Sequence, residues 1–217
     1  MARLAVLLLT GLLALTASAQ PSIPEIENRA AALDALDNPD ALYRAAAVIY
    51  IGRTGLADDG PLLVEHLHDD NPVVRALAEQ NVWRVWSRSG DSEVDELLAA
   101  GVEEMELGLY NEAIYTFSNV IRRKPDFAEG WNKRATALFL AGDLRRSLAD
   151  CDEVMKRNPQ HFGALSGYGQ IYFRLEEYDK AIEYFRRALA VNPNLTGLET
   201  AIHGIEKLQR EKRGRSI

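Results

Sequence analysis

The sequence contains a single cysteine, Cys151. One cysteine excludes an internal disulfide, so the fold has to be stabilised by packing. Positive charge is also in short supply, with 25 Lys and Arg residues against 32 Asp and Glu residues. A net negative charge disfavours nucleic acid and anionic lipid as partners, because their phosphates repel an acidic surface.

Long hydrophobic runs are missing after the first nineteen residues. Residues 1–3 form a short basic start, residues 4–15 are almost entirely apolar, and residues 17–19 are small. This order is typical of a signal peptide cleaved before Gln20, and the run is shorter than the roughly 20 apolar residues of a bilayer span. We therefore expect an exported protein, periplasmic if its source is a Gram-negative bacterium, with no membrane insertion after cleavage.

Prolines mark a regular period in the second half of the chain. Pro125, Pro159 and Pro193 are each 34 residues apart. A proline cannot continue a helix and biases the preceding residue away from helical angles, so each proline indicates a helix end. Counting back 34 residues from these positions gives three units: 94–127, 128–161 and 162–195.

The third unit carries the clearest helical pattern. Two stripes at i, i+3, i+4 and i+7 predict two helices: Leu165, Tyr168, Gly169 and Tyr172, then Ala181, Tyr184, Phe185 and Ala188. Cys151 occupies the position that Phe117 and Phe185 take in the other units, so we expect a buried cysteine. A period of 34 residues with two helices resembles the tetratricopeptide repeat (TPR).

Two phrases narrow this resemblance. Residues 127–136 and 161–167 are similar to a family of TPR proteins found in bacteria and plant organelles, a family without an established biochemical activity. The similarity spans roughly residues 80–195. It implies a fold and leaves the mechanism open.

A different period precedes these units. Tyr43-Arg44-Ala45 and Val74-Arg75-Ala76 are 31 residues apart and are separated by Gly52, a leucine-rich stretch at 60–67 and an Asp/Asn-Pro turn at 69–72. This order resembles a short HEAT-like repeat.

The predicted fold is therefore all-α: a right-handed α-solenoid of helix pairs, in which HEAT-like helices are followed by three TPRs and a capping helix. The segments flanking the three units are a signal peptide (1–19), a linker and leading helix (20–39), HEAT-like helices (40–91) and a capping helix and tail (196–217). A helix over 72–88 has apolar residues on more than one face, so we expect it to join the two repeat types in one continuous solenoid.

Few side chains suggest chemistry. His66 and His68 precede two aspartates, but residues two apart on a helix point to different sides and do not easily share a metal. Gly163 and Gly167 lack the preceding strand of a phosphate loop. Each costs about 1 kcal/mol relative to alanine in a helix, which hints that something approaches the backbone there. We expect no catalytic residue, no metal and no cofactor.

The resemblance implies that the first helix of each unit lines a concave face. The predicted peptide-binding groove consists of Leu98, Val102, Met105, Asn132, Lys133, Thr136, Phe139, Ser166, Gly167, Gln170, Phe173 and Arg174. Apolar groups at one end and amide, hydroxyl and aromatic groups at the other suit an extended or helical peptide. The alternative is a surface covered by the protein itself.

The basic clamp by which cytosolic co-chaperones hold a carboxylate tail is missing. The corresponding positions carry Leu98, Val102, Lys133, Gly163 and Gly167. We therefore expect a different protein or peptide partner, bound by a monomer or weak oligomer that acts as an adaptor or scaffold in an envelope assembly.

Two charged residues depart from the repeat pattern. Glu104 stands where an aromatic residue is usual, and Arg134 where an apolar one is usual, on neighbouring first helices. We expect them to pair; the alternative is that each reaches solvent separately. The runner-up functional hypothesis is a small-ligand or enzymatic pocket between the two repeat types, near Trp83, Trp86 and Trp131.

Overall fold

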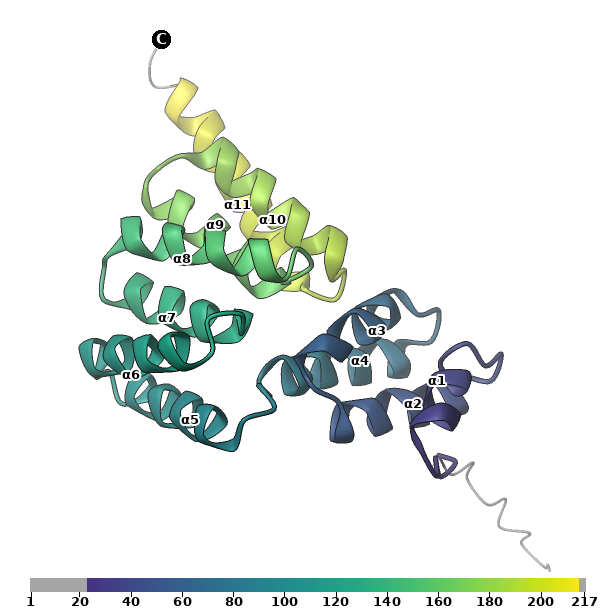
Figure 1. The fold of residues 1–217 in the computed structure, drawn as a ribbon. Coiled ribbons are helices and arrows are strands. Elements are labelled where there is room, and N and C mark those ends of the chain that lie inside the picture. Colours follow the sequence, from purple (N-terminus) through teal and green to yellow (C-terminus); the bar gives the residue numbers. More distant parts are fainter. Residues whose placement is uncertain (1–22, 215–217) are drawn as a thin grey trace, which may run out of the picture.

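The computed structural model describes residues 23–214, and within them the chain forms eleven α-helices, two short 3₁₀-helices and no strand (Figure 1). The all-α prediction is confirmed, and the predicted signal peptide lies outside the described residues. The N-terminal half consists of α1 (Arg29–Leu36), α2 (Ala41–Thr54), η1 (Ala57–Asp59), α3 (Gly60–Glu65), η2 (His66–His68) and α4 (Pro72–Trp86). We call it the HEAT half.

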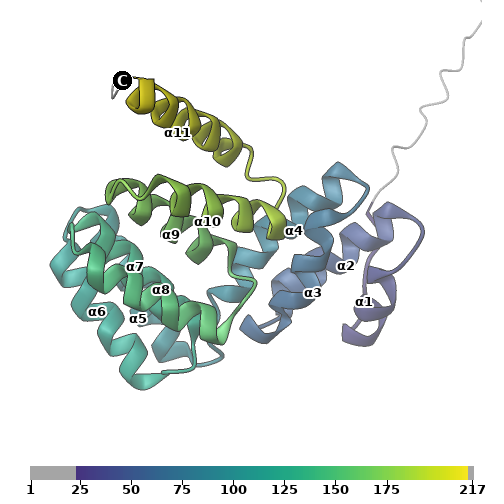
Figure 2. The same cartoon turned by 90° about the horizontal axis from the view of Figure 1, so that it is seen from above.

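The C-terminal half, called the TPR half below, is a stack of helix pairs closed by one further helix. Its helices are α5 (Ser92–Glu106), α6 (Tyr110–Arg123), α7 (Ala128–Leu140), α8 (Leu144–Arg157), α9 (Phe162–Arg174), α10 (Tyr178–Val191) and α11 (Thr196–Gly214). Figure 2 shows α11 as the last layer, beside α10. In the described part of the chain, none of the helices combines the length and hydropathy needed to cross a bilayer.

Small residues set the spacing within each helix pair. A Cβ on Gly101 of α5 would lie 2.5 Å from the ring of Phe117 of α6, and a Cβ on Gly169 of α9 would lie 2.4 Å from Phe185 of α10. In the middle pair, Ala135 replaces the glycine of the other two pairs and Cys151 replaces their phenylalanine, and these two side chains lie in one core cluster. Cys151 is buried as predicted, and burial raises the pKa of its thiol to about 12.

The turns within the pairs also follow the 34-residue period. Gly108 and Gly142 have φ values of 77° and 86°, and Glu176 takes the equivalent place with φ 58°. Glycine adopts this left-handed conformation without penalty, whereas a residue with a side chain does so at a cost. The third pair therefore carries a strained turn that the first two avoid.

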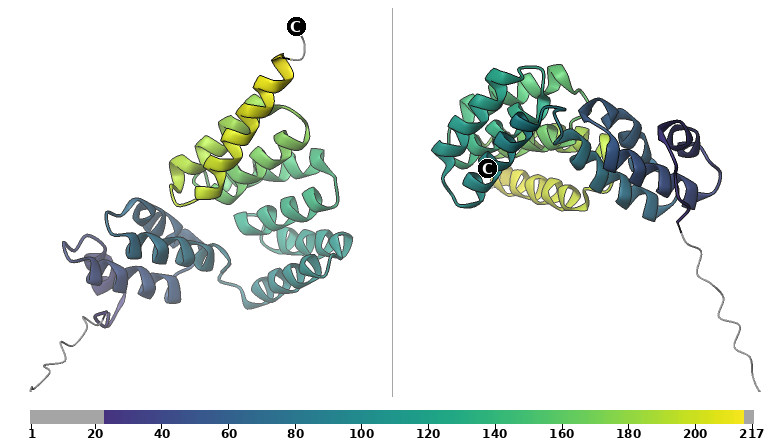
Figure 3. Two further views of the ribbon diagram at one scale, coloured as in Figure 1. Left: turned by 180° about the vertical axis from the view of Figure 1, so that it is seen from behind. Right: turned by 60° about the horizontal axis from the view of Figure 1, so that its bottom comes forward.

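The HEAT half folds back against the TPR half. His68 Nε2 lies 3.1 Å from the carbonyl oxygen of Val191, Asn194 donates to the carbonyl of Leu67 over 3.2 Å, and Asn192 donates to Glu79 over 3.1 Å. These contacts join residues more than a hundred positions apart. The HEAT half therefore packs along the edge formed by the proline-containing turns (Figure 3), whereas we expected it to extend one continuous solenoid.

Candidate functional site

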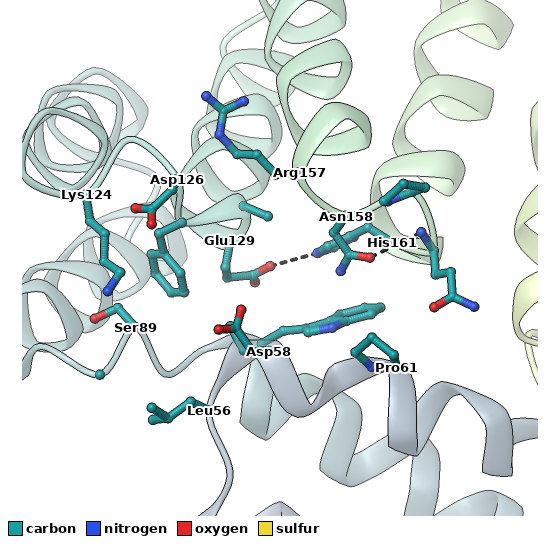
Figure 4. Close-up of a pocket in the computed structure, with 17 residues that line it drawn as sticks. Leu56, Asp58, Pro61, Ser89, Lys124, Asp126, Glu129, Arg157, Asn158 and His161 are labelled. Carbon is teal, nitrogen blue, oxygen red and sulfur yellow. Dashed lines mark hydrogen bonds and ion pairs between the residues drawn. The ribbon is translucent and has the colours of Figure 1, made fainter.

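A buried carboxylate lies at the junction of the two halves (Figure 4). Glu129, in the first turn of α7, is 1% exposed and accepts hydrogen bonds from His161 Nε2 at 2.9 Å and from Asn132 Nδ2 at 3.1 Å. Lys133 Nζ lies 3.2 Å from the other carboxylate oxygen, an ion pair without hydrogen-bond geometry. His161 Nδ1 accepts the Ala164 N–H at 3.1 Å. A neutral ring protonated at Nε2 therefore satisfies both contacts.

Glu129 is held in its charged form. Burial alone would raise its pKa, because a low-dielectric environment disfavours the carboxylate. The ammonium of Lys133 and the hydrogen bond from His161 outweigh burial and keep the pKa of Glu129 below its ordinary value of 4.5. The junction thus contains a buried carboxylate whose negative charge is stabilised by Lys133 and His161.

Two tryptophans of α4 attach the HEAT half to this network. The Trp86 ring stacks on the His161 ring with a centroid distance of 4.3 Å, and Trp83 contacts Phe162 edge-on at 5.0 Å. Trp83 also covers Gly163, where an added Cβ would lie 2.5 Å from the indole. The group that approaches the backbone at Gly163 is therefore the protein's own tryptophan.

A pocket of about 480 Å³ opens beside the network, between η1 and the turns that precede α7 and α9 (Figure 4). Its charged and polar lining consists of Asp58, Ser89, Lys124, Asp126, Glu129, Arg157, Asn158, Gln160 and His161. Trp86 lines it too. Trp131 does not line the pocket; its ring lies 4.7 Å from the guanidinium of Arg157, which does. Side chains of both positive and negative charge thus line a pocket between the two repeat types, where we expected an alternative small-ligand or enzymatic site.

A second cavity, of about 610 Å³ and mainly apolar, lies between α9 and α11. Its lining consists of Phe139, Gln170, Phe173, Arg174, Phe185, Ala201, Gly204, Ile205 and Leu208. We call it the C-terminal groove. Phe173 is 44% exposed, and the Arg174 guanidinium lies 4.8 Å from the Phe139 ring and donates to the Phe139 carbonyl at 2.9 Å. Four residues of the predicted groove therefore come together with one face of the last helix.

The first end of the predicted groove is filled. Leu98 is only 4% exposed and belongs to a core cluster with Phe117 and Ala137, so its assignment to an open groove was wrong. Val102 and Met105 are half-buried against the same cluster. This stripe of α5 therefore packs mainly against the neighbouring helices and leaves only part of Val102 and Met105 exposed.

The middle of the predicted groove is partly occupied by the junction. Asn132 and Lys133 bind Glu129, and Ser166 is half-buried. Gly167 lies near Cys151, with 3.6 Å between an added Cβ and Sγ. A small hollow of about 110 Å³ remains, lined in part by Thr136, Gly167 and Gln170. It shares Phe139 and Gln170 with the lining of the C-terminal groove.

The predicted pairing of Glu104 with Arg134 was also wrong. Arg134 donates to both oxygens of Asp150 at 2.7 and 2.8 Å and to Ser118 at 3.0 Å, so its side chain reaches between α6 and α8. One Glu104 oxygen is buried without a hydrogen-bond partner. No sequence pattern favours Asp150, sixteen residues further along, over Glu104 on the neighbouring first helix.

The histidines outside the junction contact backbone. Both ring nitrogens of His66 lie within 3.0 Å of carbonyl oxygens, those of Leu62 and Leu36. Among residues 23–214, no cluster of three or more His, Cys, Asp or Glu side chains could hold a metal ion.

Fold and site together define an all-helical repeat protein of the solenoid class. The chain contains tetratricopeptide repeats, matched by family models over residues 98–154 and 164–195, and they are preceded by HEAT repeats, matched over residues 10–83.

Curated relatives match about half of this chain. A TPR repeat-containing protein of Rhizobium etli is 32% identical over 108 residues, which cover 50% of this chain and 53% of that protein. Hsp70-Hsp90 organizing protein 1 of Glycine max is 28% identical over 120 residues, 54% of this chain and 21% of that protein. The matched region therefore spans about half of the first relative and a fifth of the second.

Solved structures show the same fold at low identity. The TPR domain of Sgt2 from Aspergillus fumigatus superposes with a TM-score of 0.54 at 19% identity, covering 57% of this chain and 83% of that one. The first TPR domain of RPAP3, bound to an HSP90 peptide, gives 0.53 at 23% identity, covering 55% and 96%.

Proposed function

We propose that this chain is an exported protein-interaction module that binds a segment of another protein in the C-terminal groove. The observation that carries the proposal is the exposed Phe173, which together with Phe139 lines a mainly apolar cavity of about 610 Å³. Exposed apolar surface next to polar groups is typical of a binding site, because covering it removes apolar area from water. Gln170 and Arg174 supply the polar groups at this site.

The similarity to peptide-binding TPR domains supports this proposal. The RPAP3 domain is described with an HSP90 peptide bound. That peptide's mode of binding is not carried over, because Leu98 is buried in the core and Gly163 lies under Trp83. The partner of this chain is therefore a protein segment other than a chaperone carboxylate tail.

Copurification after crosslinking in intact cells tests the proposal. The tagged wild type is compared with a Phe139→Ala/Phe173→Ala variant and with Tyr115→Ala, which removes an aromatic side chain that is 67% exposed on α6. A partner that is lost from the first variant and retained by the second establishes groove binding. An identical set of partners in all three samples contradicts it.

Export and a role as adaptor or scaffold in an envelope assembly belong to the same proposal. They rest on the order of charge, apolar run and small residues in residues 1–19. Mass spectrometry of the protein purified from the exported fraction is expected to find Gln20 as its first residue. An intact Met1 on protein retained inside the cell contradicts export.

A second candidate function is the binding of a small polar ligand in the junction pocket. The observation that favours it is a pocket of about 480 Å³ beside Trp86, with Lys124 and Asp126 in its lining. Screening polar metabolites by thermal shift and by tryptophan fluorescence tests it. A ligand whose effect survives Lys124→Ala and Asp126→Ala does not bind there.

A further inference from the structure

We infer that the segment bound in the C-terminal groove is an acidic amphipathic helix, which packs a large side chain against Gly204 of α11. This inference rests on the proposed function and names the class of partner. It follows from three features of the groove: a glycine without a neighbour, a lining poor in polar groups, and the sign of the charge at its edge.

Several glycines inside the helices of this chain mark close contacts with side chains of other helices. A Cβ on Gly52, Gly101, Gly130, Gly163 or Gly169 would lie between 1.9 and 2.8 Å from a side-chain atom of a neighbouring helix. The lost helix propensity, about 1 kcal/mol relative to alanine, is the cost of that close approach at each position.

Gly204 departs from this pattern, as does Gly197 in the first turn of the same helix. Gly204 lies in the middle of α11, it is exposed, and a Cβ on it would meet no atom within 4 Å. It also lines the groove, between Ala201 and Leu208. Since nothing in the described part of the chain occupies the space above it, the missing side chain leaves room for a group that comes from outside.

The lining of the groove suits a helix better than an extended peptide. An extended peptide requires partners for its backbone N–H and C=O groups, and an unsatisfied buried group is costly. Only Gln170 and Arg174 among the lining residues have polar side chains. A helix satisfies its backbone internally, and its side chains fit between the ridges of α9 and α11, as in ordinary helix packing.

The charge at the edge of the groove selects an acidic partner. Arg174 is the one charged residue that lines the cavity, and Lys207 lies one turn beyond Gly204 on α11. Neither has a carboxylate within 4 Å among the described ion pairs, although the chain as a whole carries a net charge of −7.

Selection from a displayed library of random 18-residue peptides, followed by fluorescence anisotropy, tests the inference. The enriched peptides are expected to have apolar residues at i, i+4 and i+7, a net negative charge, and at least tenfold weaker binding when a proline is placed at their centre. Gly204→Leu is expected to weaken binding at least tenfold without lowering Tm. Gly197→Leu is the matched control, because Gly197 also has no neighbour within 4 Å but does not line the groove.

A separate double variant tests whether the partner is acidic. Arg174→Ala/Lys207→Ala is expected to weaken binding of the acidic peptides several-fold and to flatten the dependence of affinity on salt. Enriched peptides that are basic, or whose affinity is unchanged in this variant, overturn the acidic character of the partner.

Two outcomes separate this inference from the proposed function. Peptides that keep their affinity for Gly204→Leu or after the proline substitution, yet lose it in Phe139→Ala/Phe173→Ala, overturn the helix and leave the groove as the binding site. Failure to enrich any peptide overturns the inference as well, and copurification with the phenylalanine variant then decides the proposed function separately.

Discussion

Trp83 of α4 lies over Gly163 of α9 so closely that a Cβ on the glycine would be 2.5 Å from the indole ring. The two residues are 80 positions apart and belong to different repeat types. Their contact, together with the stacking of Trp86 on His161 at 4.3 Å, fixes the HEAT half against the edge of the TPR half. Part of the surface around Gly163 is therefore covered by the protein itself.

Gly163→Ala is expected to destabilise the protein by about 1–3 kcal/mol, the usual cost of forcing an extra methyl group into a packed contact. This loss exceeds the gain of about 1 kcal/mol in helix propensity. Urea unfolding followed by tryptophan fluorescence measures it. Gly204→Ala is the matched control and is expected to raise stability by up to about 1 kcal/mol, since its Cβ enters open space. Equal effects of the two substitutions contradict the contact.

Arg134 and Asp150 are expected to be strongly coupled. Arg134→Met leaves the Asp150 carboxylate, which is 5% exposed, without its partner, and removing one member of a buried pair costs about 3–5 kcal/mol. A double-mutant cycle with Asp150→Asn should give a coupling above about 1 kcal/mol, whereas the cycle of Arg134 with Glu104→Gln should give less than about 0.5 kcal/mol. A larger coupling energy with Glu104 than with Asp150 would contradict the Arg134–Asp150 pair and support the pairing with Glu104 that the sequence predicted.

Glu129 is expected to make stability depend on pH in the acid range. Its folded-state pKa lies below the ordinary value of 4.5, so the unfolded chain binds a proton first. The stabilisation is present above about pH 4.5 and is lost as the pH falls further towards the folded-state pKa. Glu129→Gln, compared with wild type in urea unfolding from pH 3 to 7, should be less stable at neutral pH and less sensitive to acid. Parallel pH profiles would show that Glu129 does not contribute.

Glu176→Gly is expected to stabilise the protein by about 1 kcal/mol, because a residue with a side chain pays roughly 1–2 kcal/mol in the left-handed region. The ion pair of Glu176 with Lys212 is lost, but an exposed pair contributes little. Thermal unfolding of this variant, with Gly142→Glu as the converse substitution, measures the effect. A lower Tm for Glu176→Gly would mean that the link to α11 outweighs the strain.

The helix pairs could be predicted because their signals are local. The spacing of Pro125, Pro159 and Pro193 follows from the angles that a proline imposes on its own turn. The burial of Cys151 follows from its register with Phe117 and Phe185. Both kinds of information are present within a single 34-residue unit.

The contacts between units were harder to predict, because they depend on the angle between helices. Leu98 is apolar, as a residue of an open groove would be, but its side chain packs against α7. Trp83 meets Gly163 across 80 positions of the chain, and no pattern within a single repeat unit specifies that contact. The open position of Gly204 likewise becomes visible only when α11 is placed beside α9.

The most direct test of groove binding is site-specific photocrosslinking in intact cells, with a photoreactive phenylalanine at position 173 or at position 115. Phe173 lines the C-terminal groove, whereas the side chain of Tyr115 is exposed on α6 and does not line the groove. We predict a discrete crosslinked partner from position 173 that disappears when Gly204→Leu is added, and none from position 115. The same adducts from both positions, or adducts from position 115 alone, would contradict binding in the groove.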